Sequence, residues 1–427
     1  MFLGAVDGAQ MKQPGKNLRQ EFPIFAHNQR LVDGGKVLPL CYLDSAVSTQ
    51  KPQSVIDSMS RFLSQDYGSV HRGAYQLSMR ASEKYEAARK RVAEFVGRNI
   101  DSSQVVFTRG ATESLNILAH GIGQLRLNDK SRIVIPAIEH HANFVPWQQA
   151  ALQADCELAY IPLEGTRSER LRLDLAAAQK LITPNTAVVA LAHVGNVLGQ
   201  VNPVAEIAAM AKKVGALVVL DCAQSLTCFD DNPFDWGVDA IAFSAHKLYG
   251  PTGIGVLVAR SELLESMPPL LTGGGMIGSV TLEESTWASG VAKFEAGTPP
   301  ITEAIGLAAA LDWLDGVGRP AIHAHAARLA AEFSERLSQI NEIELFYPAT
   351  GQETLVSFRH QSIHAHDLAT LLDASNVAMR AGHHCAWPLA RLLGVDALVR
   401  ASFAAYSDVD DVDQAIEAIK NSTYLLK

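Results

Sequence analysis

The sequence predicts an α/β protein with a large domain built on a mostly parallel sheet, followed by a small C-terminal α+β domain. Short runs such as 215–220 and 187–191 are aliphatic throughout, which is typical of strands that helices cover on both faces. A glycine turn leads from the strand-like run 105–108 straight into an apolar helix. After 316–318 (GVG) the chain changes into a smaller set of helices and strands.

Length and composition indicate several globular units. The 427 residues are 48% hydrophobic and 19% charged, an ordinary globular balance. A chain of this length is too long for one simple core, so two or three subdomains are expected. We predict an N-terminal arm over 1–40, a large cofactor-binding domain over 41–310, and a small domain over 311–427 that carries a reactive cysteine loop.

Charge and patterning argue against several partners. The net charge of −9 leaves no basic stripe to neutralise the phosphates of a nucleic acid. No uninterrupted apolar stretch approaches the roughly 20 residues of a membrane span. The opening run 1–6 is interrupted by Asp7 and lacks a basic segment, so it is a poor signal peptide. Five cysteines without a CxxC pair indicate neither a disulfide framework nor a zinc ribbon, and we expect a reducing, cytoplasmic location.

The stretch 215–255 carries the densest group of candidate functional residues. Its first aliphatic run ends at Asp221, and a second run, 240–243, leads into 244–247 (SAHK). The carboxyl ends of parallel strands share the ligand-binding edge of an open α/β sheet, so these side chains should meet there. A lone lysine after a strand is usually a solvated surface residue, and a lone aspartate is usually a turn former or a helix cap. Their joint occurrence beside a glycine-rich turn favours a site.

This group of side chains fits pyridoxal phosphate chemistry. Lys247 would bond to the cofactor aldehyde, which requires an amine made less basic by burial or by neighbouring cations. Asp221 would pair with the pyridine nitrogen and keep it protonated, so that the ring can withdraw electrons. Ser244 and His246 would donate hydrogen bonds to the phosphate.

The same residues carry a family resemblance. The motifs 221–224 (DCAQ) and 243–255 (FSAHKLYGPTGIG) resemble the class V aminotransferase-like family of pyridoxal phosphate enzymes, in particular cysteine desulfurases of the Suf and Csd type. Cys222 and Ala245 stand where that family usually has glycine. The resemblance covers roughly Tyr42 to Tyr406. It implies the aspartate-aminotransferase-like fold and pyridoxal 5′-phosphate as the cofactor.

Other motifs supply the remainder of the cofactor site that the resemblance implies. In the turn 109–114 (RGATES), free backbone N–H groups at a helix N-terminus suit a phosphate. His140 is expected to stack on the cofactor ring and to carry protons. Its neighbour His141 raises the question of a metal, but adjacent residues point apart and no third ligand has a plausible spacing, so we predict none. The expected cofactor-binding residues are Ala111, Thr112, His140, Asn196, Asp221, Gln224, Ser244, His246, Lys247 and Thr298.

A second candidate centre lies in 379–389 (MRAGHHCAWPL). A cysteine beside two histidines in a loop has a polarised thiol, because nearby imidazolium groups favour the thiolate. A lone cysteine is usually a buried hydrophobic residue. The match to the desulfurases nevertheless implies that Cys385 forms the persulfide. Trp387 stands where that family commonly has glutamine.

The expected substrate-binding residues come from distant parts of the chain. An arginine fork suits an α-carboxylate through two parallel hydrogen bonds, and Arg400 follows the cysteine loop. Asn196 is expected to contact both the substrate and the phenolic oxygen of the cofactor. His71 and Arg72 would, taken alone, be an ordinary surface pair, yet the matching stretch in the family reaches the neighbouring subunit's site. Thr298 is implied in the partner's phosphate site, which predicts a twofold homodimer with shared active sites.

The resemblance implies conversion of L-cysteine to L-alanine, with the sulfur left on the enzyme as a persulfide. The expected catalytic residues are Lys247, Cys385 and His140. A sulfur-acceptor protein is expected, with iron–sulfur cluster assembly among the pathways it could serve. Two alternatives remain open: a selenocysteine lyase or class V aminotransferase acting on another amino acid, and a non-catalytic sulfur-assembly partner.

Overall fold

The computed structural model describes residues 13–31, 35–165 and 170–424. A seven-stranded sheet forms its centre, in the order β4-β12-β11-β10-β9-β5-β6. Only β12 runs against the other strands, so the sheet is mostly parallel, as expected. Its strands are β4 Val105–Thr108, β5 Arg132–Pro136, β6 Glu157–Ile161, β9 Thr186–Ala192, β10 Leu217–Asp221, β11 Ala240–Ser244 and β12 Gly255–Ala259. The opening run 1–6 lies outside the described residues.

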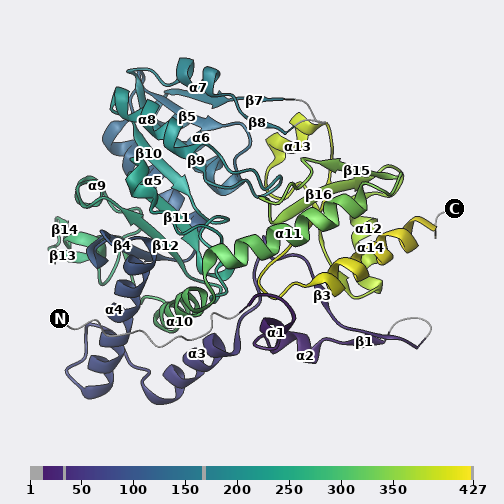
Figure 1. The fold of residues 1–427 in the computed structure, drawn as a ribbon. Helices are drawn as coiled ribbons and strands as arrows, with labels where there is room; N and C mark the ends of the chain where they lie inside the picture. The colour runs from purple at the N-terminus through teal and green to yellow at the C-terminus, as the bar shows by residue number, and fades with distance from the viewer. Residues whose placement is uncertain (1–12, 32–34, 166–169, 425–427) are drawn as a thin grey trace, which may run out of the picture.

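Helices cover both faces of this sheet, which explains the continuous aliphatic runs (Figure 1). In β10, Val218 and Leu220 pack into one buried apolar cluster, whereas Val219 packs into another on the opposite face. The surrounding helices are α3 Gln53–Gln65, α4 Gln76–Val96, α5 Ala111–Arg126, α6 Val145–Ala154, α7 Leu175–Leu181, α8 Val204–Val214, α9 Ser261–Ser266 and α10 Ile301–Val317. Two small ribbons accompany them: β7 Leu163–Glu164 with β8 Arg172–Leu173, and β13 Ile277–Val280 with β14 Ser285–Trp287.

The C-terminal part forms a separate layer with its own core (Figure 1). An antiparallel sheet of order β15-β16-β19-β18 packs against helices through buried residues such as Phe333, Phe358 and Ile416. Its strands are β15 Ile343–Phe346, β16 Leu355–His360, β18 Arg380–Gly382 and β19 Leu398–Ser402. Its helices are α11 Arg319–Leu337, α12 Ala365–Ala374, α13 Trp387–Leu393 and α14 Val409–Tyr424.

The domain limits predicted from sequence remain predictions. The boundary at 310/311 falls inside α10, whose residues Leu307 and Leu311 belong to the core of the large sheet. At the other limit, β3 Cys41–Tyr42 pairs with β17 Val377–Ala378, and Cys41 packs in the C-terminal core. The segment Cys41–Tyr42 therefore packs with the C-terminal part, although the chain that follows it builds the large part.

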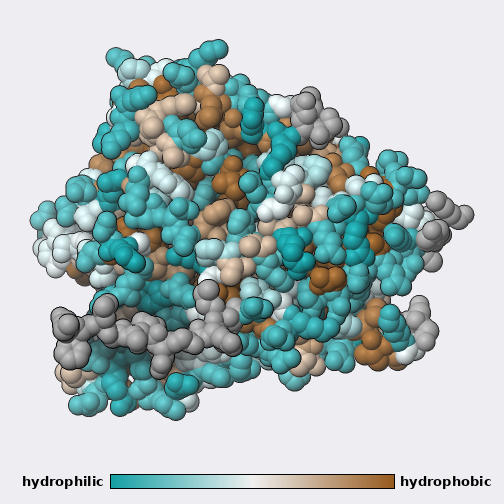
Figure 2. Space-filling model, viewed as in Figure 1, coloured by the Kyte–Doolittle hydropathy of each residue, from teal (hydrophilic) through white to brown (hydrophobic). Residues whose placement is uncertain are grey.

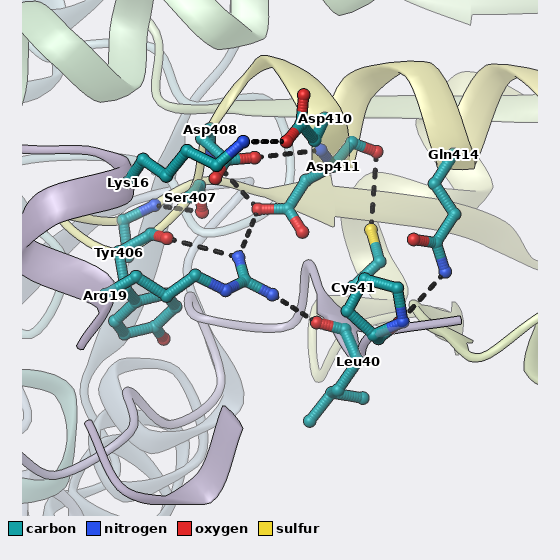
Figure 3. A network of polar contacts seen from close by, with 12 residues as sticks. Lys16, Arg19, Leu40, Cys41, Tyr406, Ser407, Asp408, Asp410, Asp411 and Gln414 are labelled. Atoms are coloured by element: carbon teal, nitrogen blue, oxygen red, sulfur yellow. Dashed lines mark hydrogen bonds and ion pairs between the residues drawn. The ribbon is translucent and has the colours of Figure 1, made fainter. Parts of the chain in front are cut away.

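The N-terminal arm is fastened to the junction of the two parts. It contains α1 Lys16–Arg19, α2 Ile24–His27, and a ribbon of β1 Arg30–Leu31 with β2 Val37–Leu38. Figure 3 shows Arg19 between the arm and α14: it donates to Asp411 at 2.7 Å and to the carbonyl oxygens of Tyr406 and Leu40. Lys16 forms an ion pair of 2.6 Å with Asp410.

An aromatic anchor completes this attachment. Phe22 is only 1% exposed, and its ring centroid lies 4.8 Å from that of Tyr406 and 5.4 Å from that of Trp313. Tyr406 follows the last strand of the C-terminal sheet, whereas Trp313 belongs to α10. Phe22 therefore docks the arm on both parts of the chain at once.

Hydrophilic side chains cover most of the face seen in Figure 2, with hydrophobic ones in scattered small groups. Within 13–31, 35–165 and 170–424, none of the helices is both long enough and apolar enough to cross a membrane.

The docked arm predicts a large effect of one substitution. Phe22→Ala removes a buried ring at the junction and should lower the free energy of unfolding by about 3–5 kcal/mol. Leu282→Ala is the control, because that side chain is 100% exposed, and its effect should stay within about 0.5 kcal/mol. Denaturant titration measures both variants. A Phe22→Ala protein as stable as the parent would show that the arm does not dock in solution.

Candidate active site

Most of the predicted site residues line one cavity of about 220 Å³. The carboxyl ends of β9, β10 and β11 form its floor, and the C-terminal part contributes the opposite wall. The predicted residues that line it are Ala111, Thr112, His140, Asn196, Asp221, Gln224, Ser244, His246, Lys247, Cys385 and Arg400. Residues from Ala46 to Arg400 in the sequence thus share one small space.

Lys247 and Asp221 are the opposed charges at the base of the cavity. Asp221 ends β10, is 6% exposed, and accepts a hydrogen bond from the N–H of Ala223 at 2.9 Å. Burial raises the pKa of Asp221, and the nearby Lys247 ammonium partly offsets that rise. Burial lowers the pKa of Lys247 to about 8; Asp221 opposes this change and Arg400 adds to it. A neutral amine is therefore accessible close to physiological pH, as a nucleophilic lysine requires.

The N-terminus of α5 opens onto the cavity beside two hydrogen-bonding side chains. The N–H of Ala111 donates to Ser244 Oγ at 2.8 Å, and Thr112 also lines the space. Gly255 lets the start of β12 lie close to the glycine turn before α5, since a Cβ at Gly255 would be 2.3 Å from the Cα of Gly110. Free N–H groups at a helix N-terminus next to hydroxyls form a site that suits a phosphate group.

His140 is held as a neutral imidazole. Its Nδ1 accepts a hydrogen bond from the N–H of Ala142 at 3.0 Å, which leaves the ring proton on Nε2. Burial, reinforced by the positive charge of Lys247, lowers the pKa of His140 to about 3. In this state the ring suits stacking on an aromatic ligand better than it suits proton uptake. Burial likewise lowers the pKa of His246 to about 4.

Arg400 presents buried donors without acceptors. The side chain is 2% exposed, and its Nη1 donates to the carbonyl oxygen of Asn196 at 2.5 Å. Its Nε and Nη2 have no hydrogen-bond partner within the described chain, and Asp44 Oδ1 lies 3.6 Å from Nη2. Buried donors without acceptors are costly, so this fork suits a bound carboxylate. Asn196 in turn donates from Nδ2 to the carbonyl oxygen of His384 at 2.7 Å.

The Cys385 loop is strained and anchored. His384 and Cys385 have φ values of 52° and 56°, in the left-handed region that residues other than glycine rarely adopt. The N–H of His141 donates to the carbonyl oxygen of Cys385 at 2.7 Å, and the N–H of Trp387 donates to His141 Nε2 at 3.1 Å. The loop is therefore held in a defined conformation against the turn that carries His140.

The expectation of imidazolium groups beside Cys385 is wrong. Burial lowers the pKa of His384 to about 2, and it also lowers the pKa values of His383 and His141 below their ordinary value. These rings are thus mostly neutral at pH 7. The positive charges around the loop belong to Arg380, Arg400 and Lys247, all of which line the cavity with Cys385.

Two residues that line the cavity and one that lies behind it are absent from the predicted site residues. Arg380 and His384 line the cavity, and both stand in the 379–389 motif that identified Cys385. From the sequence, His384 counts only as one of two histidines beside the thiol, and Arg380 has no assigned role. The third, Glu139, is 1% exposed, and burial raises its pKa to about 8. No local pattern distinguishes it from a surface glutamate.

Three predicted residues lie outside the cavity. His71 and Arg72 line a second hollow of about 540 Å³, together with Gly275, Gly297 and Pro299. Thr298 is exposed between the last two of these. The predictions that they contact substrate or cofactor concern a neighbouring subunit, and they remain predictions.

The described residues contain no group of three or more His, Cys, Asp or Glu side chains able to hold a metal ion. The thiols of Cys222 and Cys228 are buried, and burial raises their pKa values, as expected of packing residues.

Comparisons with known proteins agree with this geometry. The model of the aminotransferase class V family matches residues 41–415. A cysteine desulfurase of Haloferax volcanii is 42% identical over 94% of this chain and 95% of its own. A probable cysteine desulfurase of Vibrio cholerae is 40% identical over 96% and 98%.

Solved structures give the same result. The cysteine desulfurase CsdA of Escherichia coli, in an S-sulfonic acid form, superposes with a TM-score of 0.86 at 35% identity, covering 96% of this chain and 98% of its own. The apo cysteine desulfurase of Thermococcus onnurineus gives 0.88 at 34% identity, covering 97% and 99%.

The charge of Lys247 can be tested without any ligand. Because its pKa lies near 8, reductive methylation of the amine by formaldehyde and cyanoborohydride should rise with pH and reach half its maximum near pH 8. Peptide mass spectrometry after a short labelling pulse measures the extent at each pH. A midpoint near the solution value of about 10.4 would contradict the proposed desolvation.

Proposed function

The chain belongs to the aminotransferase class V family, and on that basis we propose that it is a pyridoxal phosphate-dependent cysteine desulfurase. It converts L-cysteine to L-alanine and retains the sulfur on Cys385 as a persulfide. One observation carries the proposal: a lysine of lowered pKa, an arginine fork and a thiol line the same cavity. The relatives named cysteine desulfurase match nearly the whole chain.

The residues around the cavity fit pyridoxal 5′-phosphate. Lys247 would bond to the cofactor, Asp221 would pair with its pyridine nitrogen, and the α5 N-terminus at Ala111 and Thr112 would hold its phosphate. The remaining contacts would come from His140, Asn196, Gln224, Ser244 and His246. When bound, the cofactor supplies an electron-withdrawing ring that stabilises negative charge at the α-carbon of the substrate.

The chain's own residues would carry out the sulfur transfer. Arg400 binds the α-carboxylate through Nε and Nη2, which orients the substrate. Lys247 Nζ moves the α-proton, a role that its pKa of about 8 permits. The Cys385 thiolate attacks the substrate sulfur; the new S–S bond forms as the carbon–sulfur bond breaks, and the freed carbon gains a proton. L-cysteine and the Cys385 thiol thus give L-alanine and a Cys385 persulfide, with no external oxidant or reductant.

We further propose that the enzyme is a twofold homodimer with shared active sites. His71, Arg72 and Thr298 are the residues expected to act across a subunit boundary, and they are the ones that do not line this chain's own cavity. The persulfide then passes to a thiol of an acceptor protein. The proposal includes a cytoplasmic location, because release of the persulfide sulfur requires a reducing environment. It also includes iron–sulfur cluster assembly as a pathway that could receive the sulfur.

The alternatives differ in their need for Cys385. A selenocysteine lyase or an aminotransferase acting on another amino acid would use Lys247 and Asp221 but should turn over its substrate without this thiol. A non-catalytic sulfur-assembly partner would produce no alanine at all.

The function is tested with purified protein, pyridoxal phosphate, L-cysteine and a thiol reductant. Alanine and sulfide are quantified for the parent, Cys385→Ser and Cys156→Ser, the last a matched control because Cys156 is also partly exposed. We expect equal amounts of both products from the parent and the control. Cys385→Ser should lose at least about 100-fold in rate, because it removes the attacking nucleophile.

Two results would contradict the proposal. Full activity of Cys385→Ser would exclude the persulfide route, and a parent that binds cofactor but leaves L-cysteine unchanged would exclude desulfuration. In either case selenocysteine and other amino acids are the next substrates to test.

A further inference from the structure

A buried carboxyl group lies just behind the cavity without any role in the chemistry described so far. Glu139 lies three residues after the end of β5, precedes His140, and is 1% exposed. No cation pairs with it in the described chain; its hydrogen bonds come from a backbone N–H and a side-chain amide. Burial of a carboxyl group is costly, so its position requires a structural or functional reason.

One oxygen of Glu139 supports the end of a central strand. The paired register of β5 with β9 ends at Val134 and Val189. Glu139 Oε1 accepts the N–H of Ala192, the last residue of β9, at 2.9 Å. Ala192 lines the cavity and is the register partner of Asp221 in β10. This contact therefore fixes the strand end beside the aspartate expected to hold the cofactor ring.

The other oxygen holds the turn that follows. Glu139 Oε2 accepts from Asn143 Nδ2 at 2.7 Å, and Asn143 Oδ1 accepts from Trp147 Nε1 at 3.1 Å. All three side chains are buried. An indole nitrogen only donates, so the amide of Asn143 cannot turn over without losing that bond, and Glu139 must accept at both oxygens. A carboxyl group can do so, whereas a carboxamide accepts at one atom only.

The turn held in this way carries contacts to both reactive parts of the site. The His140 ring lines the cavity and is oriented by the N–H of Ala142. The next residue, His141, donates its N–H to the carbonyl oxygen of Cys385 and accepts at Nε2 from the N–H of Trp387. A shift of the turn would therefore move the His140 ring and the Cys385 loop together.

We propose that Glu139 is a positioning residue that locks the 139–143 turn to the end of β9, and thereby fixes His140 and the Cys385 loop relative to Asp221. This inference rests on the proposed function for the roles of those three residues. It assigns to Glu139 no contact with substrate or cofactor.

The test compares one substitution with its compensated form. In Glu139→Gln the side-chain NH2 group must face either the N–H of Ala192 or the Nδ2 of Asn143, so two donors oppose each other at one of these contacts. The double variant Glu139→Gln/Asn143→Asp restores every bond: the new carboxamide accepts from the N–H of Ala192 and donates to the new carboxylate, which still accepts from Trp147. Asp239→Asn is the control, since Asp239 is a partly buried carboxyl group that accepts from the N–H of Val218 near the start of β10 and does not line the cavity.

Three quantities are measured on each variant. They are the dissociation constant for pyridoxal phosphate by absorbance titration of cofactor-free protein, the rate of Cys385 alkylation by iodoacetamide in that protein, and kcat and KM with L-cysteine. Glu139→Gln should bind the cofactor more weakly, change the alkylation rate, and lose up to about 100-fold in kcat, the cost of a small misplacement. The double variant should recover most of each change, and Asp239→Asn should leave all three at parental values.

Two outcomes would overturn the inference. In the first, Glu139→Gln keeps the parental cofactor affinity, alkylation rate and kcat. In the second, the double variant folds but recovers none of these quantities. If Glu139→Gln is too unstable to purify, the double variant decides alone: near-parental values support the inference, and losses as large as those predicted for the single variant refute it. A parent inactive on L-cysteine would instead refute the proposed function, while the binding and alkylation measurements still test Glu139.

Discussion

Desolvation of Lys247 is the constraint on which the site depends. In water a lysine amine is protonated and unreactive at neutral pH, and only its burial beside Arg400 and Arg380 brings the pKa to about 8. Asp221 opposes this shift and is itself made harder to ionise by burial. Such an environment needs a floor without water, which the sheet provides because helices cover both of its faces. The continuous aliphatic strands are therefore a requirement of the chemistry as well as of the fold.

The cavity also requires two parts of the chain to stay in contact. Lys247 and Asp221 come from the large sheet, whereas Arg400 and Cys385 come from the C-terminal sheet and its loop. Hydrogen bonds join the two sides through Asn196, which accepts from Arg400 and donates to His384. The N-terminal arm clamps the same junction from outside through Phe22 and Arg19.

Some of this arrangement could be read from the sequence because its signals are local. Aliphatic runs locate the strands, and the polar residues that end them share one edge of the sheet, as Asp221 and Ser244 do. The apolar helix predicted after the 105–108 run is α5, which begins at Ala111 directly after the glycine turn. The motif around Cys385 likewise marked a loop that does line the cavity.

Other features depend on contacts that no local pattern encodes. The imidazole of His384 is neutral because the fold buries it, whereas its place beside the thiol in the sequence suggested a charged ring. The hairpin β13–β14 follows a glycine loop and is exposed along both strands, so it has no apolar alternation to reveal it. Glu139 resembles a surface residue until the fold places Ala192 and Asn143 beside it.

In the proposed reaction the sulfur of the substrate is transferred to Cys385. Its most direct measurement is peptide mass spectrometry after holoenzyme receives one equivalent of L-cysteine without reductant and is then quenched with an alkylating agent. We expect one additional sulfur atom on the peptide that contains Cys385, formed together with alanine, and none on the peptides of the other cysteines. Alanine formation with an unmodified Cys385 peptide would contradict it.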